Sequence, residues 1–124
     1  MLTERGKRLF KRNQEIYELF MTNADRVEMC NKFGISRGAI ASAVYQQERH
    51  IKNYNDKDNY IYRKFFDNEE IELDMYVLTR FSNAIMFKYK KEDQLVQALK
   101  DGSIYKARCV GKKCVELLKI IYKI

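Results

Sequence analysis

The chain has 124 residues, which is enough for one domain or two very small ones, and its Lys and Arg side chains outnumber Asp and Glu by 24 to 17. The net charge of +7 and the pI near 9.3 favour a polyanionic partner. Three cysteines without C-x-x-C spacing and one histidine give no convincing zinc site, and no apolar run approaches the roughly 20 residues of a membrane span. We therefore expect a reduced, soluble, cytoplasmic protein without a metal or cofactor.

The charge is unevenly distributed along the chain. Residues 1–55 carry ten basic and six acidic side chains, residues 56–74 carry three and seven, and residues 75–124 carry eleven and four. Two basic segments therefore flank an acidic one. This pattern predicts an N-terminal module at residues 1–52, a linker at 53–69 and a C-terminal module at 70–124.

The N-terminal module is expected to contain three helices. Apolar residues recur at helical spacing through residues 2–20, and Asn23 is a plausible N-cap for a second helix. Gly34 then ends that helix in a tight turn, and Ser36 caps a third helix that runs to about Arg49. The apolar residues of the first helix are Leu9, Phe10, Ile16, Tyr17 and Phe20, and the predicted buried side of the second helix consists of Val27, Met29, Cys30 and Phe33.

The turn has the spacing of a helix-turn-helix. A small residue, Cys30, stands four positions before Gly34, an apolar one, Ile40, stands six after it, and Val44 is the next inward position. Ile35 would fill the angle between the two helices. On these residues the segment 14–50 resembles the bacterial helix-turn-helix family, although helical hairpins that bind nothing share such patterns.

This resemblance implies that the third helix reads the major groove of double-stranded DNA. Arginine and glutamine can form bidentate contacts with guanine and adenine edges, and small residues let a helix sit deep against a thymine methyl. The alternative for Ala41 and Ser42 is packing under a neighbouring helix. The DNA-binding candidates are Ser36, Arg37, Gly38, Ala41, Ser42, Tyr45 and Gln46.

The predicted linker is polar from His50 to Asn59 and then aromatic, with Tyr60, Tyr62, Phe65 and Phe66. Aromatic residues among basic ones can stack on nucleic-acid bases. Here they precede an acidic run at residues 67–70, which favours packing between the two modules.

The C-terminal module is expected to contain helices at 75–89 and 92–100, a short turn, and a last helix after Gly111. Gly111 would take a positive φ in a tight hairpin and let a phosphate approach the following helix N-terminus. Lys112 and Lys113 oppose the helix dipole in the first turn, so they suit anion binding better than helix stability. The alternative is an ordinary turn followed by a solvated helix.

Residues 70–122 resemble the C-terminal domain of the bacterial RNA polymerase α subunit. The resemblance rests on the approach Ile71-Glu72-Leu73-Asp74, on Arg80 and Asn83 in one helix, and on Gly111-Lys112-Lys113. It implies a helix-hairpin-helix fold in which Arg80 enters the minor groove of A/T-rich DNA. Asn83, the Gly111 amide and Lys113 would hold the flanking backbone.

The chain departs from that family at three places. Cys109 and Cys114 stand where the family has asparagine and serine, which puts one polar backbone contact in doubt. The pair Leu78-Thr79 also lies one residue closer to the arginine than expected. The fragment 68–124 is nevertheless expected to fold and to bind DNA by itself.

The sequence thus predicts an all-α DNA-binding transcription regulator of a bacterium or bacteriophage, with no catalytic residues and no membrane partner. One alternative is an adaptor that mimics the α C-terminal domain and contacts host RNA polymerase through protein surfaces. A second is a nuclease or recombination accessory that uses the hairpin for nonspecific DNA binding. The sequence specifies no oligomeric state.

Overall fold

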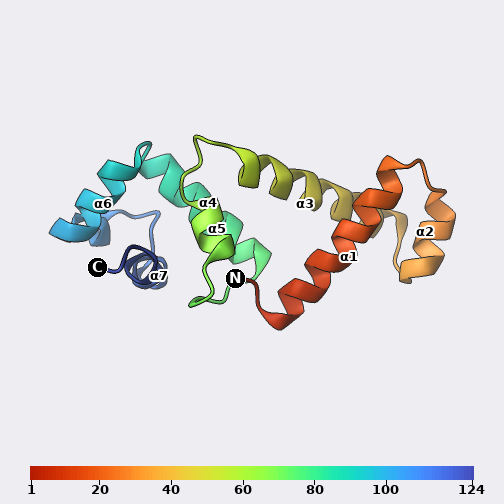
Figure 1. Ribbon diagram of the computed structural model, residues 1–124, viewed down its shortest axis with the longest axis horizontal. Helices are drawn as coiled ribbons and strands as arrows, with labels where there is room; N and C mark the ends of the chain where they lie inside the picture. The colour runs from red at the N-terminus through yellow and green to blue at the C-terminus, as the bar shows by residue number, and fades with distance from the viewer. The chain divides into compact units, whose positions relative to one another are not determined.

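A computed structural model describes all residues from Met1 to Ile124 and contains helices but no strands, which confirms the all-α fold class. The chain divides into an N-terminal unit, Glu4–Asn55, and a C-terminal unit formed by Met1–Thr3 and Asp56–Ile124. The elements, labelled in Figure 1, are α1 (Glu4–Met21), α2 (Arg26–Phe33), α3 (Arg37–Asn55), α4 (Tyr62–Asp67), α5 (Met75–Lys88), α6 (Glu92–Asp101), the 3₁₀ helix η1 (Ser103–Lys106) and α7 (Lys112–Tyr122).

The N-terminal unit is a small three-helix arrangement in which α1 packs mainly against α3 and α2 packs against both (Figure 1). Its core confirms the inward positions predicted for the α2–α3 turn. Ile40 and Val44 are buried, and Cys30, Phe33 and Ile35 pack against them. The buried residues at the centre are Ile16, Met29, Ile40, Ala43 and Val44.

The start of α2 differs from the prediction. Asn23 does not cap this helix: it has a φ of 61° and closes α1, because asparagine tolerates the left-handed conformation. The N-cap is Asp25, whose carboxylate accepts hydrogen bonds from Val27 N at 2.7 Å and Glu28 N at 3.1 Å. This start turns Val27 outward, where it is 50% exposed, so its predicted burial is wrong.

The turn between α2 and α3 forms as predicted. Gly34 has a φ of 65° and donates its N–H to the Cys30 carbonyl at 2.8 Å, which ends α2. Ser36 Oγ accepts a hydrogen bond from Ala39 N at 3.2 Å and so caps α3. The two helices are therefore separated by residues 34–36 alone.

Helix α3 is longer than predicted and continues through Asn55 instead of ending near Arg49. Polar composition does not stop a helix when one face still packs and no glycine or proline intervenes. Here His50 lies edge-on against Phe10 of α1, with ring centroids 4.8 Å apart. The N-terminal unit consequently extends three residues beyond the expected boundary at residue 52.

The segment predicted as a linker, 53–69, instead belongs largely to the C-terminal unit. Ile61 and Phe65 are fully buried there, and Phe65 packs against Phe81 of α5 with ring centroids 6.3 Å apart. Asn59 Oδ1 accepts a hydrogen bond from Tyr62 N at 3.1 Å and so caps α4, while its amide contacts Ser82 Oγ at 3.4 Å. The linker prediction is therefore wrong, because Asn59 is a capping residue of a short packed helix.

Residues 1–3 also contribute to the C-terminal unit. Leu2 is buried and forms an isolated parallel bridge with Leu73, in which Thr3 N donates to Leu73 O at 3.1 Å and Leu73 N donates to Met1 O at 2.9 Å. A fragment of residues 68–124 would lack Leu2, Ile61 and Phe65. We therefore no longer expect that fragment to fold alone, and the full chain is required for experiments.

The remaining helices of the C-terminal unit lie close to their predicted ranges. Leu78, Phe81 and Ile85 are buried on the inner face of α5, and Gly102, with a φ of 77°, ends α6. Helices α4, α6 and α7 are joined at Glu92, whose carboxylate accepts a hydrogen bond from the Tyr122 hydroxyl at 2.8 Å and pairs with Lys64 at 3.1 Å.

Candidate nucleic-acid interface

The backbone at Gly111 differs from the predicted hairpin. Its φ of −75° and ψ of 164° are extended, so it does not use the positive φ that only glycine adopts easily. The chain reverses earlier, where Val110 N donates to the Ala107 carbonyl at 3.2 Å. Gly111 is the N-cap of α7, and it supplies no side-chain oxygen for the N–H groups of the first helical turn. Lys112 and Lys113 in that turn are exposed.

The C-terminal unit brings α5 and the start of α7 together. Arg80 and Asn83 are exposed on α5, and Cys109 donates a weak hydrogen bond to the carbonyl of Ala84 at 3.8 Å. Arg80 is also close enough to Cys114 to interact with it electrostatically. The segment of α5 that carries Arg80 and Asn83 therefore lies beside the chain that leads into α7, where Gly111, Lys112 and Lys113 follow Cys109.

The two cysteines that depart from the family pattern have structural roles. Cys114 is 1% exposed, and burial raises the pKa of its thiol to about 12, with the nearby Cys109 raising it further and Arg80 opposing the shift. Cys109 is exposed but directed at the Ala84 carbonyl.

The sequence-predicted residues of α3 and its cap all lie at the surface. Arg37, Gly38, Ala41, Ser42 and Tyr45 are exposed, together with Ser36 and Gln46. Ala41 and Ser42 are thus not packed under a neighbouring helix, which removes the alternative for these two residues. Their small side chains leave the backbone of α3 open to approach.

Gln46 is exposed but already engaged within the protein. Its Oε1 accepts a hydrogen bond from Asn13 Nδ2 at 3.2 Å, and its Nε2 donates to Ser42 Oγ at 3.3 Å. The buried Asn13 in turn accepts from Arg12 at 3.0 Å. This chain links α1 to α3, and it occupies the amide that the sequence suggested for base contacts.

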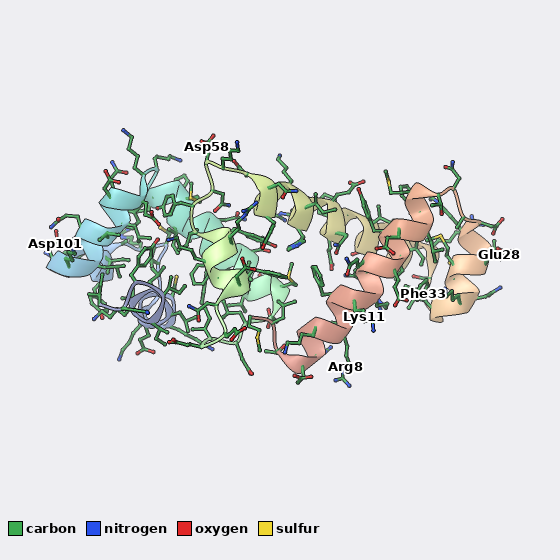
Figure 2. The ribbon with its side chains drawn as sticks, in the orientation of Figure 1. Arg8, Lys11, Glu28, Phe33, Asp58 and Asp101 are labelled. Atoms are coloured by element: carbon green, nitrogen blue, oxygen red, sulfur yellow. The ribbon has the colours of Figure 1, made fainter.

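The positive charge of the N-terminal unit is concentrated at the start of α1. Figure 2 shows Arg8 and Lys11 on the side of α1 turned away from α3, and both are exposed. The exposed surface of α3 carries fewer cations, namely Arg37, Arg49 and Lys52. Arg8 and Lys11 therefore do not extend the exposed face of α3, whereas Arg12 lies next to it through Asn13 and Gln46.

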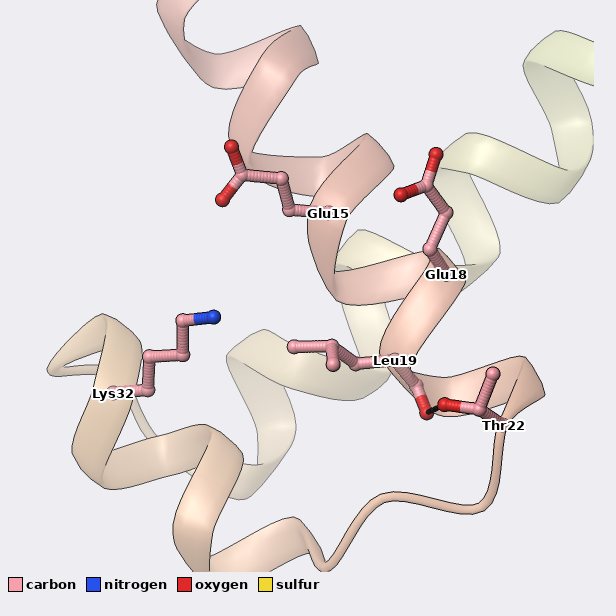
Figure 3. A pocket seen from close by; sticks show the side chains of 5 residues that line it. All are labelled: Glu15, Glu18, Leu19, Thr22 and Lys32. Atoms are coloured by element: carbon pink, nitrogen blue, oxygen red, sulfur yellow. Dashed lines mark hydrogen bonds between the residues drawn. The ribbon is translucent and has the colours of Figure 1, made fainter.

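A hollow of about 270 Å³ lies between α1 and α2, lined by Glu15, Glu18, Leu19, Thr22 and Lys32 (Figure 3). The Thr22 hydroxyl donates to the Leu19 carbonyl at 2.9 Å, so it is already paired. None of the sequence-predicted site residues lines this hollow. No group of three or more His, Cys, Asp or Glu side chains is placed to hold a metal ion.

Sequence reasoning missed two exposed aromatic residues on α5, Tyr76 and Phe87, which are 73% and 75% exposed. The available signal was their spacing, because residues 76, 80, 83 and 87 share one helical face with Arg80 and Asn83. The Asn13–Gln46 hydrogen bond had no such signal, since its partners are 33 residues apart.

None of the helices is both long and apolar enough to cross a membrane. Comparisons of the chain with protein-family models, curated proteins and solved structures found no match.

Proposed function

We propose that this chain is a DNA-binding transcription regulator of a bacterium or bacteriophage. Helices α2 and α3 would act as a helix-turn-helix that reads the major groove, and the region around α5 and the start of α7 would hold the minor groove and backbone. The observation that carries the proposal is the adjacency of the α5 segment bearing Arg80 and Asn83 to the chain around the start of α7, which bears the exposed Lys112 and Lys113.

The geometry around Arg80 supports a contact with a narrow groove. Its guanidinium carbon lies 5.8 Å from the ring centroid of Tyr76 and 5.6 Å from that of Phe81, so two rings restrict its position. Asn83 is one helical turn away on the same face. Narrow A/T-rich grooves concentrate negative potential, which favours an inserted arginine.

The start of α7 supports a backbone contact beside that groove. Its first-turn N–H groups and the ammonium groups of Lys112 and Lys113 are suited to a phosphate, because both the helix dipole and the side chains attract negative charge. Phosphate contacts position a protein without carrying sequence information. Base-edge reading in the major groove is assigned to Arg37 and its neighbours on α3, and the A/T preference is assigned to Arg80.

Selection of bound duplexes from a random pool by the full-length chain tests the proposal. A recovered consensus supports a specific regulator. Salt-sensitive binding without a consensus indicates a nonspecific accessory, and the absence of duplex binding indicates an adaptor that acts through protein surfaces.

Two variants test the assigned roles in the C-terminal unit. Arg80→Ala should erase a preference for A/T-rich over G/C-rich duplex, whereas Lys113→Ala should weaken both duplexes alike. Lys100→Ala on α6 is the charge-matched control, since it removes one exposed lysine outside the proposed site. Equal effects of Lys113→Ala and Lys100→Ala would mean that Lys113 contributes only through the general positive charge of the protein and not through a specific phosphate contact.

A further inference from the structure

Four exposed side chains, Tyr76, Arg80, Asn83 and Phe87, follow one another along a single face of α5. We call this set the α5 stripe. Successive members are three or four residues apart, so the stripe spans about 16 Å along the helix axis. Both of its ends are aromatic rings that are about three-quarters exposed.

Each of the two rings is paired with a cation. Besides the guanidinium of Arg80 near Tyr76, the ammonium of Lys90 lies 5.6 Å from the ring centroid of Phe87. These pairs combine a flat surface for stacking with a positive charge for a phosphate. They are a different arrangement from an apolar patch that would cover another protein.

The charge around the α5 stripe favours an anionic occupant. Helix α5 contains no aspartate or glutamate, and Lys88, Lys90 and Lys91 follow Phe87 at its C-terminal end. Asp74 lies at the other end, where its carboxylate caps the helix by accepting a hydrogen bond from Val77 N at 2.8 Å. The surroundings of Phe87 are therefore more positively charged than those of Tyr76.

Aromatic rings add little to the binding of an undisturbed duplex, because its bases are stacked on one another. A protein ring can reach the face of a base only where the stack is open, as in a single strand or at a base step opened by an inserted side chain. We propose that the α5 stripe binds DNA at unpaired or unstacked bases, with Phe87 and Tyr76 on the bases and Arg80 and Asn83 on the neighbouring groove or backbone. The inference rests on the proposed function for its DNA partner.

The experiment compares two probes with the full-length chain by fluorescence anisotropy: a matched duplex, and the same duplex with about four unpaired nucleotides at its centre. The unpaired probe should bind about tenfold more tightly, a gain typical of base–aromatic stacking. Phe87→Ala should abolish most of that gain, and Tyr76→Ala should have a smaller effect. Tyr105→Ala is the matched control, because Tyr105 is 52% exposed and paired with Lys119 but lies on η1 outside the α5 stripe.

A spectroscopic measurement distinguishes stacking from a change in folding. The chain contains no tryptophan, so Phe87→Trp introduces a single tryptophan that can be excited selectively over the tyrosines, and its emission should be quenched by the unpaired probe. Tyr105→Trp should not be quenched. Equal binding of both probes, equal effects of Phe87→Ala and Tyr105→Ala, or an unquenched tryptophan at position 87 would overturn the inference.

The two probes also separate this inference from the proposed function. Binding of the matched duplex without preference for unpaired bases would overturn the inference alone. Binding of the unpaired probe with no measurable matched-duplex binding would contradict the proposed major-groove reader and leave the α5 stripe supported. If neither probe bound, both proposals would fail.

Discussion

The exposed faces of α3 and α5 are built from different kinds of side chain. On α3 the central residues Ala41 and Ser42 are small, and Gln46 is held by hydrogen bonds to Asn13 and Ser42. On α5 two rings and an arginine project outward, with cations beside each ring. The proposed function therefore assigns close, sequence-dependent contact to α3 and groove and backbone contact to α5, and the further inference adds stacking by the two rings of α5.

The largest expected difference between the two units is in their stability at high pH, where the C-terminal unit should be the less stable one. The pKa values of Tyr60, Tyr89, Cys114 and Tyr122 are all raised, mainly by burial, and all four residues lie in the C-terminal unit. A raised folded-state pKa contributes stability that is complete below the unfolded-state value and is lost as pH rises toward the folded-state value. For Cys114 the stability is therefore lost over a pH window that runs from 9.0 to about 12.

Cys114 alone should contribute on the order of 4 kcal/mol across this window. Amide and methyl NMR signals followed during alkaline titration should show the C-terminal unit losing its native signals before the N-terminal unit. Simultaneous loss in both units, or no loss until pH 12, would contradict this difference.

The sequence predicted the α2–α3 turn well because its signals are local. Gly34, Ser36 and Ile40 each have a backbone or burial requirement that depends on neighbours a few residues away. The same reasoning predicted the inner face of α5 and the end of α6.

The prediction failed where distant residues decide the structure. The polar segment after Arg49 remains helical because His50 packs on Phe10, and Asn59 was interpreted as a linker residue although it caps α4 and contacts Ser82. The hairpin predicted at Gly111 rests on the glycine, the two lysines and the amphipathic helix that follows, none of which fixes the backbone conformation of Gly111. Its extended backbone shows that glycine followed by lysine does not by itself indicate a positive φ.

Arg37→Ala should show whether α3 reads sequence. If Arg37 contacts a base edge, its loss should cost about 1–3 kcal/mol at one position of the selected site and leave nonspecific affinity nearly unchanged. Affinity measured on duplexes that vary at each position checks this result. Uniform weakening on every duplex would make Arg37 a phosphate contact.

Gln46→Ala is expected to act on stability instead of sequence preference. It would leave the buried Asn13 amide without its acceptor, which should lower the free energy of unfolding by about 1 kcal/mol. Gln14→Ala, which removes an exposed glutamine of α1, is the control for chemical denaturation. A relaxed base preference with unchanged stability would restore Gln46 as a reading residue.

Gly34, which ends α2, and Gly111, which precedes α7, should differ in their tolerance of alanine. Gly111→Ala should change the unfolding free energy by less than about 0.5 kcal/mol, because its φ is ordinary and an added Cβ meets nothing within 4 Å. Gly34→Ala should cost about 1 kcal/mol, because its φ is positive. Denaturant unfolding of both variants checks the contrast, and equal costs would contradict the assigned backbone roles.

The salt dependence of duplex binding by the full-length chain tests the central claim most directly. If α3 and the region of α5 and the start of α7 together contact about four to six phosphates, the slope of log affinity against log salt concentration should be roughly −4 to −5. With such a slope, the affinity for duplex DNA should fall by about several hundredfold when the salt concentration rises fourfold. A slope near zero, or no duplex binding at low salt, would contradict DNA as the partner and favour an interaction through protein surfaces.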